Sequence, residues 1–222
     1  MNSRQWVPRA SRRVVACIAA VAVASELVGC GASTLSLTGG SIPIGTASIR
    51  GVVVRADAAS QVLSGASVLL SYESNGTGST DSNRSGGFAF TNIGAGSYWC
   101  TLSGQISSGY AQQMRWPINV ATGTTVQVLA RALPTNFDAT QVKQIALTTK
   151  NITMHVGDST MLAAVATGSQ GQPLTVQPTI QVLGGLGTLA ADGTFTATAT
   201  GTTRVEAWLD TAEDDTSITI QP

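Results

Sequence analysis

The chain has 222 residues with 12 basic and 12 acidic side chains, so its formal net charge is zero. Ser, Thr and Gly supply 75 residues while aromatic residues make up only 5%, a composition that favours short strands joined by turns over long helices. A single histidine excludes a zinc site built from several histidines. Because there is no basic excess, we expect no nucleic-acid binding.

The first 29 residues have the parts of an export signal. Residues 1–13 carry four arginines and no acid, and residues 14–24 form an apolar run. This run is too short to cross a bilayer, which takes about 20 residues, but it suits the apolar region of a secretory signal. We expect the general secretory route, and Ser11-Arg12-Arg13 leaves twin-arginine export open.

The signal ends in Leu27-Val28-Gly29-Cys30. These residues resemble the lipobox of bacterial lipoproteins. The resemblance implies a cleaved signal peptide over 1–29 and a lipid on Cys30 that anchors the protein to a membrane surface. Gly31 stands where an aspartate would signal inner-membrane retention, so the resemblance implies the outer membrane in a Gram-negative cell. The alternative is an ordinary secretory signal with a chance cysteine.

Without the signal peptide the chain keeps 193 residues and two cysteines, Cys30 and Cys100. Because a lipidated Cys30 has no free thiol, we expect no intramolecular disulfide. Cys100 alternates with Tyr98 and Leu102, so its thiol is predicted to be buried and unreactive. Residues 30–46 are uncharged and rich in Gly, Ser, Thr and Ala, and they are predicted to form the lipidated cysteine and a flexible tether.

From residue 47 apolar and polar residues alternate in short runs, the pattern of β-strands with one buried face. Glycine-rich turns separate the runs. The predicted strands are 47–54, 66–72, 88–90, 97–103, 114–120 and 124–133. The inward-facing sets are Val68/Leu70/Tyr72, Phe88/Phe90, Tyr98/Cys100/Leu102 and Val126/Val128/Ala130/Ala132.

This stretch carries a series of motifs in a fixed order. They are Ile49-Arg50-Gly51-Val52-Val53, Gly65-Ala66-Ser67-Val68, Thr80-Asp81 through Phe88-Ala89-Phe90, Ile93, and Gly96-Ser97-Tyr98. In order and spacing they resemble the carboxypeptidase regulatory-like domain, a transthyretin-like sandwich, with a slightly longer loop over 81–87. The resemblance implies one β-sandwich over 47–134.

A linker is predicted over 135–141, and a second set of strands follows within 142–222. The predicted strands are 144–148, 152–156, 159–167, 174–182, 187–189, 194–198, 202–209 and 216–221. Val156-Gly157-Asp158-Ser159, Ala191-Asp192-Gly193-Thr194 and Gly201-Thr202-Thr203 resemble the bacterial Ig-like domain of group 2. We therefore predict an all-β protein with two tandem β-sandwich domains, each able to unfold by itself.

Two motifs carry residue types used in catalysis or metal binding. His155 lies between Met154 and Val156, out of phase with the inward set, so we expect it on an exposed face without a catalytic role. Asp81-x-Asn83-x-Ser85-Gly86 resembles the first half of a calcium loop, but Asn92 stands where the closing glutamate belongs. A hairpin turn capped by its own side chains explains this loop without a metal, and we expect Asp81 to be the cap.

The remaining candidates are acidic and aromatic. Glu213-Asp214-Asp215 is predicted to be a solvated loop in the last hairpin and not a ligand set. Trp99 and Trp116 are predicted on the face opposite the inward sets, and Trp208 is out of phase with Val205 and Ala207. Exposed tryptophans either bind a sugar or protein partner or pack under a neighbouring loop or domain.

Together these observations predict a non-enzymatic, lipid-anchored protein of the bacterial cell envelope. We expect a structural, adhesion or presentation role on the periplasmic or extracellular face. The alternative is a carbohydrate- or polymer-binding accessory module that acts with a separate enzyme. The sequence contains no recognisable pair of catalytic nucleophile and base, so we expect neither enzymatic activity nor a cofactor. The expected partners are the membrane, through the lipid on Cys30, and an envelope glycan or protein.

Overall fold

The computed structural model describes residues 36–37, 42–58, 61–72, 76–103 and 114–222. Cys30 and the signal segment lie outside these residues. The described chain is built from strands, with a single three-residue 3-10 helix, η1 (Ala139–Gln141). The all-β prediction is therefore confirmed. No helix of the described residues has the length and apolar character needed to cross a membrane.

The first sheet has five strands in the order β1-β4-β3-β6-β7. Its strands are β1 (Ser36–Leu37), β3 (Ser67–Tyr72), β4 (Gly76–Asp81), β6 (Gly96–Ser103) and β7 (Met114–Val120). All its pairings are antiparallel. Strand β4 was not predicted, because its run of Gly, Ser and Thr has no apolar alternation to reveal a strand.

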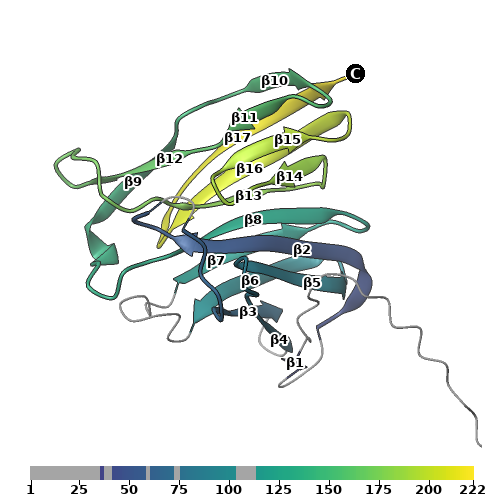
Figure 1. Cartoon of the computed structure of the whole chain (residues 1–222), viewed down its shortest axis with the longest axis horizontal. Helices are drawn as coiled ribbons and strands as arrows, with labels where there is room; N and C mark the ends of the chain where they lie inside the picture. Colours follow the sequence, from purple (N-terminus) through teal and green to yellow (C-terminus); the bar gives the residue numbers. More distant parts are fainter. Residues whose placement is uncertain (1–35, 38–41, 59–60, 73–75, 104–113) are drawn as a thin grey trace, which may run out of the picture. The chain divides into compact units, whose positions relative to one another are not determined.

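The second sheet has seven strands in the order β10-β17-β16-β13-β8-β2-β5, and Figure 1 shows it from β10 at the top of the view to β5 below β2. Its strands are β2 (Ile44–Arg55), β5 (Gly87–Ile93), β8 (Thr125–Ala132), β10 (Ile152–His155), β13 (Thr179–Val182), β16 (Gly201–Leu209) and β17 (Ala212–Gln221). The β2–β8 and β10–β17 pairs are parallel and the other pairs are antiparallel.

Two small sheets complete the fold. One contains β11 (Ser159–Met161), β14 (Gly187–Leu189) and β15 (Thr194–Ala197), and the other pairs β9 (Val142–Leu147) with β12 (Ala164–Gly168). The single strand predicted over 159–167 is thus divided between two sheets. Leu162 and Ala163 form the break, and the Leu162 amide bonds to Gly193 O.

The first core lies between the five-stranded sheet and the β2–β5–β8 part of the long sheet. The predicted inward sets are buried there, apart from Tyr72, which is half-buried and packs against the core. Gly51 is a site of close approach, because a Cβ at this position would lie 2.5 Å from the Phe88 ring. Gly86 at the tip of the 81–87 loop has φ of +75°, a conformation that glycine adopts without strain.

The second core lies on the opposite face of the long sheet, as two rows of paired residues make clear. Each row contains one residue from each of β2, β8, β13 and β16. One row is Gly51, Val128, Gln181 and Glu206, and the next is Val52, Leu129, Ile180 and Ala207. Since paired residues share a face, Val128 points into the first core while Leu129 points towards the second. Strand β8 is therefore buried on both faces and belongs to both halves of the protein.

Two predicted features differ from the structure at their ends. The predicted tether contains the strand residues Ser36–Leu37 and the first three residues of β2, which begins at Ile44. Val156, predicted to face inward, is 45% exposed. Strand β10 ends at His155, and Val156 begins the turn into β11, so the alternation stops one residue earlier than predicted.

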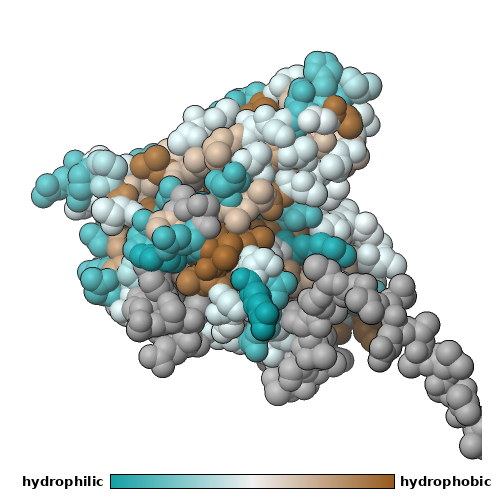
Figure 2. Space-filling view, in the orientation of Figure 1, coloured by the Kyte–Doolittle hydropathy of each residue, from teal (hydrophilic) through white to brown (hydrophobic). Residues whose placement is uncertain are grey.

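Figure 2 shows that polar and weakly apolar residues share one face of the molecule, with apolar side chains gathered near its middle. The large exposed apolar residues of the described chain are scattered over several strands and turns: Ile44, Val62, Trp99, Val156, Met161 and Val165. Single exposed apolar residues of this kind are normal on protein surfaces.

Candidate functional site

The 81–87 loop is a side-chain-capped turn, and its cap is Asn83. The Asn83 Oδ1 atom accepts hydrogen bonds from the backbone amides of Ser85 and Gly87, both at 2.9 Å, and from the Ser85 hydroxyl. Asp81, the predicted cap, is instead an exposed end residue of β4 paired with Ser67. Asn83 is one of the side chains that best satisfy such a turn, and the sequence offered both residues.

The acidic run 213–215 lies in strand β17 and not in a loop, which corrects the prediction. The turn of this hairpin lies at Asp210-Thr211, before the run. Asp214 accepts a 2.7 Å hydrogen bond from the backbone amide of Leu147 and pairs with Lys150. Although partial burial opposes it, hydrogen bonds from Lys150 and Leu147 lower the pKa of Asp214. This carboxylate therefore joins β17 to β9.

His155 and Cys100 lie where the sequence analysis expected them. The His155 side chain is exposed, with Nδ1 3.7 Å from an Asp158 carboxylate oxygen. Cys100 is fully buried, and burial raises the pKa of its thiol well above the ordinary value. Among the described residues no three His, Cys, Asp or Glu side chains gather in a metal-binding group.

The two tryptophans of the first half lie on opposite faces of the β6–β7 pair. Trp99 is 41% exposed, and the Arg115 guanidinium stacks over its ring at 4.0 Å. Trp116 is 1% exposed and pairs with Cys100, so it faces the first core. The prediction of an outward Trp116 is wrong. Residues directly opposite each other share a face, and Trp99 is opposite Pro117, one position out of phase with Trp116.

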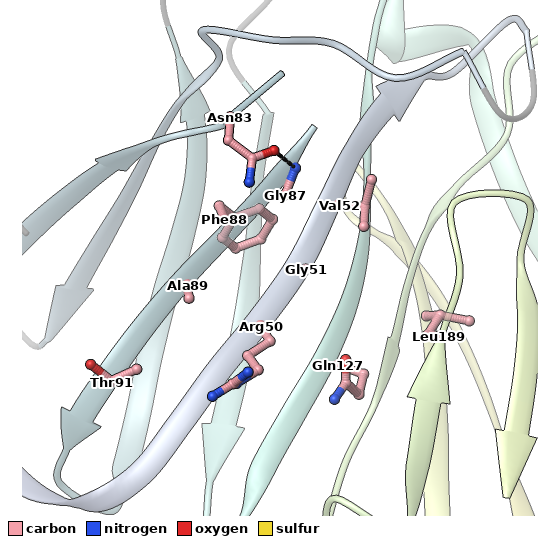
Figure 3. A pocket seen from close by; sticks show the side chains of 10 residues that line it. All are labelled: Arg50, Gly51, Val52, Asn83, Gly87, Phe88, Ala89, Thr91, Gln127 and Leu189. Atoms are coloured by element: carbon pink, nitrogen blue, oxygen red, sulfur yellow. Dashed lines mark hydrogen bonds between the residues drawn. The ribbon is translucent and has the colours of Figure 1, made fainter. Parts of the chain in front are cut away.

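A shallow hollow of about 310 Å³ lies over the outer face of β5, β2 and β8. Arg50 on β2 stands between its paired neighbours Ala89 and Gln127. Figure 3 shows Asn83 and Phe88 towards one end of the hollow and Arg50 and Gln127 towards the other. Leu189, from β14 in the second half of the chain, lines its far side. This site was not predicted, because its residues come from four segments far apart in the chain.

The hydrogen-bonding groups of this hollow are not all used by the protein. No described residue forms an ion pair or hydrogen bond with the Arg50 guanidinium or the Gln127 amide. Asn83 uses its Oδ1 to cap the turn, and its amide nitrogen has no bonded partner in the described chain. The hollow thus offers a cation and two amide groups beside the apolar side chains of Val52 and Leu189.

Side chains of two sequence motifs in this half of the chain satisfy their own turns. The Ser82 hydroxyl donates to Leu63 O and accepts from the Ala66 amide, and the Tyr98 hydroxyl donates to Gly94 O. Both contacts lie in the motifs singled out by sequence. Residues 48–133 match the carboxypeptidase regulatory-like domain. The hollow therefore lies on the β5–β2–β8 face of this regulatory-like domain.

Comparison with solved structures gives only distant likeness. Domains 4–9 of the surface layer protein SbsC are 12% identical with a TM-score of 0.27, over 85% of this chain and 30% of that one. Invasin, a bacterial integrin-binding protein, is 16% identical with a TM-score of 0.24, over 84% and 39%. Extracellular domains 3–5 of Drosophila OTK are 12% identical with a TM-score of 0.26, over 86% and 66%.

The chain spans only about a third of the length of the first two structures. No curated protein matches the chain.

Buried polar residues at the junction of the two halves escaped the sequence analysis. Gln181 donates to Glu206 and, at 3.0 Å, to the backbone carbonyl of Pro117 on β7. Glu206 also accepts from the Trp208 indole at 3.3 Å and pairs with Arg204. These bonds join the edge of the regulatory-like domain to β13 and β16.

Arg131, near the end of β8, is a buried cation without an acidic partner in the described chain. Its side chain is 3% exposed, its Nη1 reaches Arg55 O at 3.5 Å, and its Nε has no bonded partner. Burial lowers the pKa of Arg131 to about 10, so the guanidinium remains charged at neutral pH. A buried charge of this kind costs stability, and nothing in the sequence pattern of β8 revealed it.

Proposed function

We propose that the protein is a lipid-anchored component of the bacterial cell envelope with a non-enzymatic structural, adhesion or presentation role. The observation that carries this proposal is the lipobox-like Leu27-Val28-Gly29-Cys30, placed directly ahead of an all-β body. The match of residues 48–133 to the regulatory-like domain supports the non-enzymatic part, because this is a non-catalytic type of domain. A location on the periplasmic or extracellular face belongs to the same proposal.

The division into a regulatory-like sandwich over 47–134 and a group-2 Ig-like sandwich over 142–222 is also a proposal. Its support is that each half has its own buried apolar layer. Since β8 pairs with β13, however, the two sandwiches would share a continuous sheet. A body of this kind would hold the second sandwich in a fixed direction from the first, as presentation at a surface requires.

Metabolic labelling tests the anchor. If a lipid is attached to Cys30, the wild-type chain incorporates labelled fatty acid and partitions into the detergent phase, and a Cys30→Ala chain does neither and keeps its signal peptide. Cys17→Ala is the matched control, because this cysteine lies within the signal. Labelling that persists in Cys30→Ala would refute the anchor.

A second candidate function is the binding of an envelope polymer. The predicted pair of exposed tryptophans, Trp99 and Trp116, does not support polymer binding, since Trp116 is buried. The hollow on the regulatory-like domain does, because its Arg50 guanidinium and Gln127 amide have no partner among the described residues.

A further inference from the structure

The hollow over β5, β2 and β8 is a place where ligand-binding groups are held ready on rigid strands. Arg50 lies on the middle strand, paired with Ala89 on one side and Gln127 on the other. The small neighbours Gly87 and Ala89 leave the space that forms the hollow. A guanidinium in such a place presents a planar set of donors suited to a carboxylate.

The amide groups extend this donor set. The Gln127 side chain is half-buried beside Arg50, and its amide has both a donor and an acceptor without a bonded partner in the described chain. The Asn83 amide nitrogen supplies a further donor, while its Oδ1 is fixed by the turn. Groups that both donate and accept match hydroxyl groups, which do the same.

The rest of the lining is apolar. Val52 and Leu189 are the apolar side chains on the outer face that line the hollow, and Leu189 comes from the second half of the chain. The volume of about 310 Å³ lies at the lower end of the range for small-molecule sites, which runs from about 300 to 1,000 Å³. The space suits one ring-sized unit of a larger ligand, with apolar contact on one side and polar contacts at its rim.

We propose that this hollow binds one acidic sugar unit of an anionic glycan, with Arg50 holding the carboxylate and Gln127 and Asn83 contacting hydroxyl groups. A single cation with two amides and the apolar side chains of Val52 and Leu189 matches one carboxylate, several hydroxyls and the C–H face of a sugar ring. The inference rests on the polymer-binding candidate above and is independent of the lipid on Cys30.

An acidic peptide suits the site less well. Extended peptides bind sheets chiefly through free backbone groups at an edge strand. Here Arg50 lies on β2, whose backbone pairs with β5 on one side and β8 on the other. The edge strand of this sheet is β5, and a peptide paired with its free edge would lie beside the hollow and not over Arg50.

Isothermal titration of the whole chain in detergent with a tetrasaccharide of uronic acids tests the proposal. We expect saturable binding that weakens with salt. Arg50→Gln should weaken it about tenfold or more, because a charge-assisted pair is lost. Gln127→Ala should have a smaller effect. Arg115→Gln is the matched control, since it removes the same charge from the other sheet and should leave the affinity unchanged.

Two further ligands separate the possible outcomes. The carboxyl-reduced, neutral tetrasaccharide should bind at least tenfold more weakly to the wild type. A glutamate-rich peptide of equal charge should not compete. No binding of the acidic sugar, equal loss in Arg50→Gln and Arg115→Gln, or peptide binding at the same strength would each overturn the proposal. Melting curves of each variant exclude misfolding, and fatty-acid labelling of Cys30 reports separately on the anchor.

Discussion

Replacing Arg131 with methionine should stabilise the protein, contrary to the usual effect of changing a buried residue. Burial lowers the pKa of Arg131 from its ordinary value to about 10, which corresponds to a cost of about 3 kcal/mol for the charged form, at 1.36 kcal/mol per pKa unit. Against this, Arg131→Met loses the 3.5 Å hydrogen bond to Arg55 O, worth roughly 1 kcal/mol. The backbone amide of residue 131 still bonds to the Thr179 hydroxyl. We expect a net gain of about 1–3 kcal/mol.

Urea unfolding followed by circular dichroism measures this gain. The midpoint should rise without a change of slope, and the melting temperature should rise by about 2–4 °C per kcal/mol for a chain of this size. Arg50→Met is the matched control. This arginine is exposed on the same sheet, so its loss should change stability by less than about 0.5 kcal/mol.

The pH dependence has a definite sign. The pKa of Arg131 is lower in the folded chain than in the unfolded chain, so above about pH 10 the folded chain binds fewer protons than the unfolded chain. The cost of burying the charged guanidinium is therefore fully present below about pH 10 and decreases above about pH 10. The advantage of Arg131→Met should be constant near neutral pH and narrow above pH 10. Destabilisation by Arg131→Met of more than about 1 kcal/mol would show that the buried guanidinium has a net stabilising interaction, contrary to this prediction.

Four other predictions follow from the contacts described. Asn83→Ala should lower the free energy of unfolding by about 1–2 kcal/mol because the turn loses its cap, whereas Asp81→Ala should change it by less than about 0.5 kcal/mol. Calcium and chelator should give the same melting curves. Equal destabilisation by Asn83→Ala and Asp81→Ala would contradict the assignment of Asn83 as the cap. The Cys100 thiol should resist maleimide in the folded protein even at pH 9, since burial raises its pKa, and should react fully in denaturant; rapid labelling of the native protein would refute its burial. Gln181→Ala should cost about 2–4 kcal/mol by leaving Glu206 buried without its amide donor, and Thr219→Ala, on an exposed position of β17, is the control. The fragments 44–135 and 142–222 should each be less stable than the whole chain, because separation leaves Leu129 exposed and β8 without β13; fragments as stable as the intact protein would argue against the shared strand.

Alternation along single strands was enough to predict most of the core. Phe88/Phe90 and Tyr98/Cys100/Leu102 are buried as expected, because side chains in a strand point to opposite faces in turn and the apolar set must leave water. The glycine-rich turns were equally legible, since residues such as Gly86 adopt a backbone conformation that other residues avoid. These are local properties, and they hold whatever the strand is paired with.

The partner of each strand was decided only by the tertiary structure. Alternation marks two faces on a strand but not the sheets that will cover them, and β8 is covered on both because it joins two cores. The burial of Trp116 and Arg131 follows from such long-range pairing, as does the meeting of Arg50, Asn83 and Leu189 around one hollow. Residues far apart in the chain have no mutual signal in a single sequence, since their contact depends on how whole sheets pack against each other.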